Sequence, residues 1–259
     1  WDDAQYELGW SFVRLGRIQE AVDSFRAVVQ QSDDEVLKTA ALCRIGDTWL
    51  ESNELEKALE AYDEVLKDFP KSLYSDYAQY QSGFVLSRLG RLDGALLSFQ
   101  SLLVNFPNSR FRDEALYRLA ECFMRKNDFV EASRIYQRFI DSFPESNLRE
   151  KAYFQLGNCY YNQKQYDKAL MVFKDIFGRT PDSDVGRLSK FQMGWCYFKL
   201  NREKEAIAHF EGYLKRYPSG DTAADVNYGL GEYYYRRGQY DRALGYFEEV
   251  QKRFSSSNA

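Results

Sequence analysis

The sequence has few of the residues that interrupt regular secondary structure. Only 5 prolines and 16 glycines occur among 259 residues, which favours helices over a β fold rich in turns. Long apolar runs are also missing, since the most apolar stretch, residues 95–106, is interrupted by four polar residues. A helix that spans a bilayer needs roughly 18 consecutive apolar residues. We therefore expect no membrane insertion by this segment.

A basic excess is absent as well. The net charge is −4 with acids and bases mixed throughout, whereas nucleic-acid binders usually carry a basic balance or a basic stripe. The single histidine, His209, is expected at a surface or edge position. No glycine-rich phosphate loop, metal-ligand spacing or nucleophile motif occurs. We expect a chain that binds no nucleic acid, holds no cofactor or metal and is not an enzyme.

Aromatic residues, in contrast, reach 17 %, more than the core of a compact domain of this size requires, and an internal repeat organises them. A small residue recurs every 37 residues, an alanine follows it by 12 residues, and an aromatic residue follows that alanine by four. The small residues are Gly9, Gly46, Gly83, Ala120, Gly157, Gly194 and Gly231; the alanines are Ala21, Ala58, Ala95, Ala132, Ala169, Ala206 and Ala243; the aromatics are Phe25, Tyr62, Phe99, Tyr136, Phe173, Phe210 and Phe247. Seven units account for the whole chain: 1–37, 38–74, 75–111, 112–148, 149–185, 186–222 and 223–259.

Each unit is predicted to form two helices. In the second unit, apolar residues follow helical spacing in two blocks, 41–49 and 55–66. Between the blocks stands a residue that tolerates positive φ, which is Gly or Asn in six units and Lys164 in the fifth, where we expect local strain. Phe-Pro-x-Ser, as at 69–72, links the units, and its serine is expected to cap the next helix. The small residues predict close contact of helix backbones, with the aromatic residue filling the space between neighbouring hairpins.

This pattern resembles the tetratricopeptide repeat. The resemblance is carried in the fifth unit by Leu156, Gly157, Tyr160, Ala169, Phe173 and Pro181, and it extends over all seven units. It implies a single domain, 1–259, that is all-α: a right-handed superhelical solenoid of seven helical hairpins, about 14 helices, acting as a protein–protein interaction scaffold. The 37-residue period and the Phe-Pro-x-Ser link also resemble the bacterial repeats of outer-membrane assembly lipoproteins and of the Tol–Pal coordinator protein, which implies a role in envelope assembly.

In this family, one face of each first helix lines a concave groove that binds a peptide or a partner protein. On this face we expect an aromatic stripe beside a row of cations. The stripe consists of Tyr6, Trp10, Val13, Tyr77, Tyr80, Phe84, Tyr117, Glu121, Met124, Phe154, Asn158, Tyr161, Phe191, Trp195, Phe198, Tyr228, Glu232 and Tyr235, and the cations are Arg14, Arg88, Arg125, Lys199 and Arg236. Large aromatics beside arginine are typical of binding hot spots. They predict an extended or helical peptide ligand with apolar side chains and some acidic character.

The stripe has two interpretations. Its first position is aromatic in six of seven units, which indicates packing against the next repeat. The other positions vary more and are better candidates for ligand contact, while the cations are also compatible with a solvated rim. A carboxylate clamp of the kind known in this family needs a set of Lys or Asn on adjacent first helices, and only Asn158 is polar in that manner. We therefore do not expect such a clamp.

Other functions compete with the scaffold. Trp and Tyr platforms also stack on sugars, so a glycan- or peptidoglycan-binding module is one alternative. Single-stranded RNA binding by base stacking is another, although the net charge of −4 and the 37-residue period speak against it. The last unit runs into serines 255–257 without a polar capping helix, so apolar surface left there would allow self-association into a structural scaffold.

The cysteines bear on the location of the protein. Cys122, Cys159 and Cys196 share one repeat position, and equivalent points on stacked hairpins lie ~8–10 Å apart, beyond the ~7 Å between Cα atoms that a disulfide tolerates. We expect these three to be buried and reduced, and Cys43, at a groove position, to be an accessible thiol. Unpaired cysteines favour the cytoplasm, whereas the link motif favours the bacterial periplasm or cell envelope, so both stay open. Because the sequence begins at Trp1 without Met, we expect a piece of a longer protein.

Overall fold

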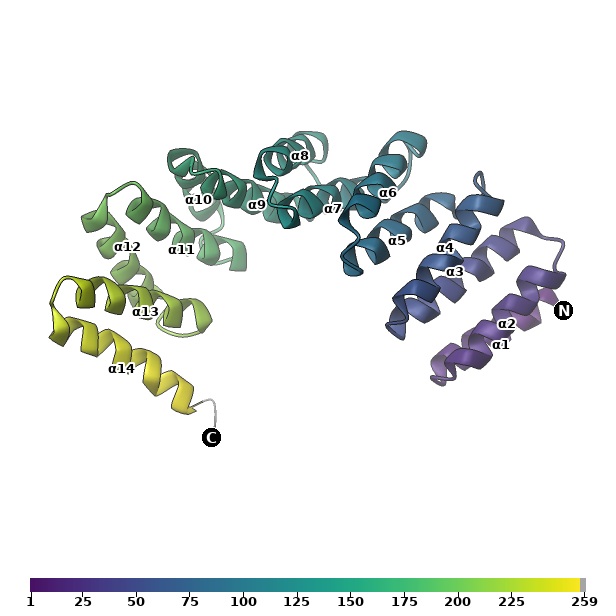
Figure 1. The fold of residues 1–259 in the computed structure, drawn as a ribbon, viewed down its shortest axis with the longest axis horizontal. Coiled ribbons are helices and arrows are strands. Elements are labelled where there is room, and N and C mark those ends of the chain that lie inside the picture. Colours follow the sequence, from purple (N-terminus) through teal and green to yellow (C-terminus); the bar gives the residue numbers. More distant parts are fainter. Residues whose placement is uncertain (257–259) are drawn as a thin grey trace. The chain divides into compact units, whose positions relative to one another are not determined.

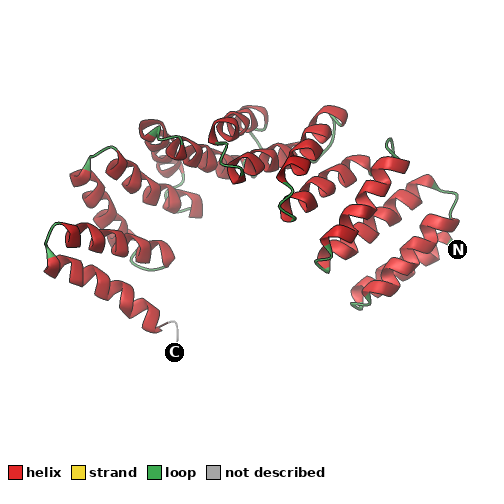
Figure 2. Cartoon of the chain, in the orientation of Figure 1, coloured by secondary structure: helices red, strands yellow, loops and turns green. Residues whose placement is uncertain are grey.

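The computed structural model describes the backbone of residues 1–256 and the side chains of residues 1–252. Within this part of the chain there are 14 α-helices and no strand (Figures 1 and 2). The helices are α1 (Asp2–Arg14), α2 (Ile18–Gln31), α3 (Glu35–Glu51), α4 (Leu55–Asp68), α5 (Ser75–Arg88), α6 (Leu92–Asn105), α7 (Arg112–Arg125), α8 (Phe129–Ser142), α9 (Arg149–Asn162), α10 (Tyr166–Arg179), α11 (Asp184–Lys199), α12 (Glu203–Arg216), α13 (Asp221–Arg236) and α14 (Tyr240–Ser256). The predicted all-α repeat solenoid is confirmed.

The chain divides into two compact units, called here the N-terminal unit (residues 1–146, α1–α8) and the C-terminal unit (residues 147–259, α9–α14). Within each, every odd-numbered helix packs against the helix that follows it to form a hairpin, and hairpins stack on one another (Figure 1). Consecutive odd-numbered helices also contact each other, from α3 to α7 and from α9 to α13. The first helices of neighbouring hairpins therefore share one surface, which we call the first-helix face.

A residue in the left-handed region ends the first helix of every hairpin, as the sequence predicts. The φ angle lies between 59° and 76° at Gly16, Asn53, Gly90, Asn127, Lys164, Asn201 and Gly238. The next residue donates its N–H to a carbonyl five residues back, for example Gln165 to Tyr160 at 2.8 Å. This bond satisfies a carbonyl that the helix end would otherwise leave unpaired. Lys164, at φ 61°, carries the expected strain, about 1–2 kcal/mol for a residue with a Cβ.

In six of the seven hairpins, a glycine of the first helix contacts the aromatic ring of its own second helix. A Cβ added at Gly9 would lie 2.6 Å from Cε1 of Phe25, and one added at Gly46 would lie 2.5 Å from Cε1 of Tyr62. Both rings are fully buried. The ring thus lies between the two helices of one hairpin. This corrects the expectation that it fills the space between neighbouring hairpins: without a Cβ on the glycine, the backbone of its own first helix offers the closer surface.

The serine of the Phe-Pro-x-Ser link does not cap the next helix at the expected positions. Ser72 Oγ accepts a hydrogen bond from the N–H of Tyr74 at 3.3 Å, and Ser109 Oγ accepts one from Phe111 at 3.1 Å. These bonds form a turn two residues long, and α5 and α7 begin only after it. The expectation of a serine cap is wrong here, because the turn separates the serine from the helix.

The link before α11 is tighter and does contain a serine cap. Here α11 begins at Asp184, and Ser183 Oγ accepts a hydrogen bond from the N–H of Gly186 at 2.9 Å. A Cβ at Gly186 would lie 1.8 Å from the carbonyl oxygen of Thr180. Only glycine therefore allows the helix to start directly after the serine.

The last helix, α14, carries exposed large side chains. Tyr240 and Leu244 are 62 % and 57 % exposed. Of the serines at 255–257 that the sequence places at the end of the last unit, the side chains of the first two and the whole of the third lie outside the described residues. Self-association through this end stays a prediction. None of the helices in residues 1–256 is both long enough and apolar enough to cross a membrane.

Candidate functional site

The first aromatic position of the stripe is used for packing inside each hairpin. The ring centroids of Tyr6 and Phe25 lie 5.4 Å apart. Equivalent pairs at 5.5–6.2 Å are formed by Tyr80 with Phe99, Tyr117 with Tyr136, Phe154 with Phe173, Phe191 with Phe210, and Tyr228 with Phe247. Packing within the same hairpin is thus shown, and at Tyr80 it extends toward the next hairpin, since this ring also stacks on Phe111 in the link to α7 with centroids 5.3 Å apart. Tyr117 is buried and leaves little surface for a partner, whereas more than half of Tyr228 is exposed.

In the second hairpin, the aromatic ring of the second helix, Tyr62, is packed by a residue from a different position. The residue of this hairpin at the first aromatic position is Cys43, which is fully buried, so the expectation of an accessible thiol is wrong. Tyr77 of the next hairpin packs against Tyr62 in place of the missing aromatic residue, with ring centroids 6.3 Å apart. Burial raises the pKa of the Cys43 thiol to about 12, so almost no thiolate forms at neutral pH.

The other cysteines and the histidine lie away from the pockets of the first-helix face. Cys122, Cys159 and Cys196 are buried and free, as predicted. His209 lies deeper than expected, since it is half-buried and its Nε2 is 2.7 Å from the carbonyl oxygen of Lys190. Burial lowers the pKa of this imidazole. Among the described residues, no group of three or more His, Cys, Asp or Glu is placed to hold a metal ion.

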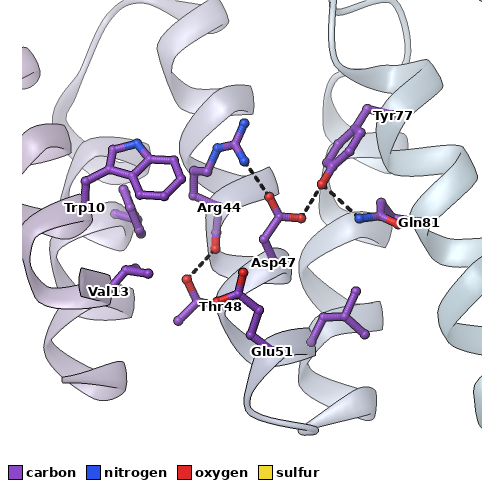
Figure 3. Close-up of a pocket in the computed structure, with 10 residues that line it drawn as sticks. Trp10, Val13, Arg44, Asp47, Thr48, Glu51, Tyr77 and Gln81 are labelled. Atoms are coloured by element: carbon purple, nitrogen blue, oxygen red, sulfur yellow. Dashed lines mark hydrogen bonds and ion pairs between the residues drawn. The ribbon is translucent and has the colours of Figure 1, made fainter. Parts of the chain in front are cut away.

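A pocket of about 260 Å³ opens on the first-helix face of the N-terminal unit (Figure 3). It lies where α1, α3 and α5 meet, and it is lined by Trp10, Val13, Phe25, Arg44, Asp47, Thr48, Leu50, Glu51, Tyr77 and Gln81. Figure 3 shows Trp10 and Val13 on one side, Tyr77 and Gln81 on the other, and Arg44 and Asp47 between them. The pocket therefore combines apolar walls with a polar centre.

Asp47 is the centre of this polar network. Its Oδ2 accepts a hydrogen bond from Arg44 Nη1 at 2.7 Å, and its Oδ1 accepts bonds from the hydroxyls of Tyr62 at 2.7 Å and Tyr77 at 2.5 Å. Desolvation and the nearby carboxylate raise the pKa of both hydroxyls, so they stay protonated donors. The guanidinium carbon of Arg44 lies 5.2 Å from the centroid of the Trp10 ring. Arg44 thus stands between an aromatic ring on α1 and a carboxylate on α3.

The same arrangement recurs two hairpins later. The guanidinium carbon of Arg118 lies 5.6 Å from the centroid of the Phe84 ring, and Arg118 Nη1 donates to Glu121 Oε2 at 2.8 Å. We call each of these groups, Trp10–Arg44–Asp47 and Phe84–Arg118–Glu121, an aromatic–arginine–acid cluster. Both link the first helix of one hairpin to the first helix of the next.

The C-terminal unit has a pocket of about 320 Å³ between α11 and α13. It is lined by Trp195, Phe198, Glu203, Gly229, Glu232, Tyr233, Arg236 and Arg237. Trp195 and Phe198 also contact the buried Phe210, at ring-centroid distances of 5.3 and 5.7 Å. Part of each ring therefore belongs to the core, and the rest forms a wall of the pocket.

The predicted row of cations is exposed to solvent, but two of its members bind groups of a neighbouring hairpin. Arg88 Nη2 donates to Asn53 Oδ1 at 2.7 Å, and Arg125 Nη1 donates to the carbonyl oxygen of Ser87 at 2.7 Å. These arginines bridge neighbouring hairpins. A third member, Arg236, pairs with Glu232 of its own helix at 3.6 Å, and the remaining exposed members are Arg14 and Lys199.

The remaining stripe residues differ in how much surface they offer. Asn158 donates to Gln155 Oε1 at 2.9 Å, and Tyr161 packs on Tyr166 with ring centroids 5.3 Å apart. Burial raises the pKa of Tyr161 to about 12. Met124 is half-buried, and Tyr235 is exposed. The exposed part of the stripe thus lies mainly on α13 and at the two pockets.

Several residues of the site were not predicted from the sequence. They are Arg44, Asp47, Gln81, Arg118 and Gly229. The signal that could have found them is an alternation along the repeat: the position of Trp10 is acidic in the second unit, aromatic again in the third and acidic again in the fourth. An arginine stands three residues before each of those two acids.

Family models match most of the chain. Two models, both described as tetratricopeptide repeat, match residues 6–72 and 191–258 in one case and residues 77–109 and 114–146 in the other. The chain belongs to the tetratricopeptide repeat family. A model described as anaphase-promoting complex, cyclosome, subunit 3, matches residues 142–213. A search of curated proteins found no match.

Solved structures of tetratricopeptide repeat proteins share this fold. One from Parabacteroides merdae is 18 % identical, over 97 % of this chain and 92 % of that one, with a TM-score of 0.66. The C-terminal part of a repeat protein from Cytophaga hutchinsonii is 15 % identical, over 95 % and 93 %, with a TM-score of 0.73. YrrB, described as having an unusual peptide-binding site, is 19 % identical, over 78 % and 96 %, with a TM-score of 0.60. At these identities the similarity shows the fold alone.

Proposed function

We propose that this chain is a protein-interaction scaffold whose first-helix face binds a peptide segment of another protein. Tetratricopeptide repeat proteins generally are such scaffolds, and their fold is typically non-enzymatic. The observation that carries the proposal is the pocket around Asp47, where three first helices bring apolar walls and polar side chains together (Figure 3). Concave, mostly apolar sites with a few placed polar groups are typical of binding sites.

The lining of this pocket supports an apolar side chain of the partner as its anchor. Trp10 and Val13 are half-buried and present apolar surface, while Glu51 and Gln81 offer a carboxylate and an amide at the rim. A peptide bound here would bury its apolar side chain and place backbone groups near the two polar ones. The solved neighbour YrrB, described as having a peptide-binding site, supports the same class of ligand.

The predicted acidic character of the partner has less support than its apolar character. That prediction rested on the row of cations, and Arg88 and Arg125 are engaged with Asn53 and Ser87 of this chain. We propose a partner that is recognised mainly through apolar side chains, with charged contacts at the rim. Nucleic acid is not part of the proposal, because the net charge of −4 gives no basic surface balance.

The experiment compares two matched pairs of substitutions in an affinity pull-down from native lysate. Glu51→Lys with Gln81→Lys places two lysines at the pocket. Glu60→Lys with Gln100→Lys makes the same chemical change at exposed positions of the second helices α4 and α6. A partner retained by the parent chain and the second pair but lost by the first supports the proposal. If the two pairs, with equal thermal melts, retain the same proteins, the pocket on the first-helix face of the N-terminal unit is not the binding site.

A setting in bacterial envelope assembly is a separate proposal. Its support is the Phe-Pro-x-Ser link together with the 37-residue period. Fractionation of the source cells tests it: we expect the full protein in the periplasmic or membrane fraction, and recovery from the cytoplasm alone would refute it.

A further inference from the structure

The first-helix face of the C-terminal unit repeats two of the three members of the aromatic–arginine–acid clusters. Trp195 on α11 corresponds to Trp10 and Phe84, and Glu232 on α13 corresponds to Asp47 and Glu121, each acid following its aromatic residue by 37 positions. The arginine follows the aromatic residue by 34 positions in both clusters, and at this position the C-terminal unit has Gly229. The third cluster therefore lacks its arginine.

The space of the missing side chain is open. The pocket between α11 and α13, of about 320 Å³, is lined by Trp195, Gly229 and Glu232. Six of its eight lining residues occupy the repeat positions that also line the pocket of the N-terminal unit. The two pockets are thus equivalent places in the repeat, and the position of Arg44 in the first is occupied by Gly229 in the second, whose own arginines, Arg236 and Arg237, stand at other repeat positions.

Arg237 lies over the ring of Tyr233 in this pocket, at 4.8 Å from its centroid, but not over the indole of Trp195. Within the described residues, Trp195 makes ring contacts with Phe191, Phe198 and Phe210, whereas Trp10 has Arg44 over its ring. A Cβ at Gly229 would lie 3.1 Å from Cη2 of Trp195, so the absence of a side chain keeps the space beside the indole free.

The acid of this pocket is weakly paired. Glu232 Oε2 lies 3.6 Å from Nη2 of Arg236, a side chain that is 77 % exposed, and the Tyr228 hydroxyl donates to Oε1 at 3.3 Å. In the two complete clusters the arginine lies 2.7 and 2.8 Å from its carboxylate. Glu203 and Arg237, which also line the pocket, pair with each other. The group left with unused hydrogen-bonding capacity is therefore the carboxylate of Glu232.

We propose that this pocket binds an arginine side chain of the partner. The guanidinium would lie over the Trp195 ring and donate to Glu232, as Arg44 does with Trp10 and Asp47 within the chain. Of the charged groups that line the pocket, Glu203 is paired with Arg237, whereas Glu232 is only weakly paired with Arg236, so Glu232 is the group that a guanidinium of the partner would meet. The inference rests on the proposed function, because the arginine belongs to the peptide that the scaffold binds.

The test uses two synthetic hexapeptides that differ only in one residue, arginine or the neutral isostere citrulline. Binding is followed by the NMR shift of the Trp195 indole N–H, assigned by comparison with the Trp195→Phe variant. We expect the arginine peptide to shift this signal and to bind at least about fivefold more tightly than the citrulline peptide, from one cation–π contact and one exposed ion pair. Equal binding of the two peptides would overturn the proposal.

Substitutions separate the site from its surroundings. Glu232→Gln should reduce the preference for the arginine peptide and leave only the part due to the cation–π contact with Trp195, while Glu205→Gln on α12, whose carboxylate pairs with Arg202, should leave the preference unchanged. Gly229→Arg supplies the arginine from the chain and should abolish the shift. If Gly229→Arg does not fold, the Glu232→Gln variant decides. Unchanged arginine preference in Glu232→Gln would contradict the assigned role.

The outcome is independent of the pull-down. If the partner is lost from the variants at Glu51 and Gln81 but the two hexapeptides bind equally, the scaffold function stands and the arginine site is wrong. If the arginine peptide is preferred at Trp195 while the pull-down variants retain every protein, the arginine site stands and the binding face proposed for the N-terminal unit is wrong.

Discussion

Replacing Gly157 by alanine should destabilise the protein, even though alanine is the better helix former. Gly157 lies inside α9, where the change would by itself gain about 1 kcal/mol. The added methyl group, however, would lie 2.6 Å from Cε1 and 2.8 Å from Cζ of Phe173. Carbon atoms pack at about 3.5–4.0 Å, so the ring would have to retreat by roughly 1 Å. Phe173 is fully buried and packs on Phe154, so little room exists for this movement.

The expected magnitude follows from these two opposing effects. Overpacking a close-packed core costs about 1–3 kcal/mol, and the gain in helix propensity offsets about 1 kcal/mol of it. We therefore expect Gly157→Ala to lower the free energy of unfolding by about 1 kcal/mol, and by 2 kcal/mol at most. Gly212 provides the matched control, because it lies in α12 and no heavy atom lies within 4 Å of its added Cβ. Gly212→Ala should raise stability by up to about 1 kcal/mol.

The assay is urea unfolding followed by far-UV circular dichroism for the parent chain and both variants. Opposite signs of the two changes support the account of hairpin closure. If Gly157→Ala stabilises the protein as much as Gly212→Ala does, the Phe173 ring can move aside at little cost. Close packing then does not explain why glycine occupies position 157. Ala120 adds a check from the fourth hairpin, which already has a Cβ at this position: Ala120→Gly should destabilise, since nothing is relieved and helix propensity is lost.

Three further predictions concern buried groups. Cys43 should not react with a thiol reagent near pH 8 until the chain is unfolded in urea. Because the pKa of this thiol is raised in the folded chain, the free energy of unfolding should also fall as the pH rises above 9.0, the pKa of the thiol in the unfolded chain. His209 has a lowered pKa, so stability should fall as pH drops below the unfolded value of 6.5, and urea unfolding of His209→Gln should show a smaller acid dependence. Asp47→Ala removes the acceptor of the buried Tyr62 hydroxyl and should cost about 1–3 kcal/mol, whereas adding Tyr62→Phe to it should cost little more; additive effects of the two changes in urea unfolding would refute the coupling.

The fold was predictable because the two helices of every hairpin must pack against each other in the same way. The small residue, the alanine and the aromatic residue recur since two helix backbones must approach closely in each unit, and no information from elsewhere in the chain is needed. The burial of Cys43 was not predictable in this way. Its packing is completed by Tyr77 from the next hairpin, at a repeat position that is aromatic in no other unit.

The start of α5 shows a second limit of the repeat pattern. Ser72 and Ser183 occupy the same link position, yet only Ser183 caps a helix, because Gly186 lets that helix approach the Thr180 carbonyl. The deciding residue lies outside the motif that was used for the prediction. The link motif determines where the chain turns, whereas residues outside the motif determine at which residue the next helix begins.

The candidate site was predicted as a face but not as a set of contacts. The aromatic stripe identified Trp10, Phe84 and Trp195 from their spacing on the first helices. Arg44 and Asp47 were missed because their roles depend on groups from two other helices, which spacing within one helix does not reveal. Charged residues at a helical face are usually solvated, so the sequence alone gives no reason to join them to a ring.

The clusters on the first-helix face have a consequence for how such a chain grows. The core repeats with every hairpin, whereas the aromatic and acidic residues return only with every second one, so the surface has twice the period of the scaffold. Duplication of a single hairpin other than the fifth would preserve the core but place two rings or two carboxylates next to each other. Two hairpins, which we call a cassette, are thus the smallest unit that protein engineering or a gene duplication could add without changing the alternation of aromatic and acidic residues on this surface. By this count the seven hairpins are three cassettes and one spacer, the fifth, in which Asn158 is neither aromatic nor acidic.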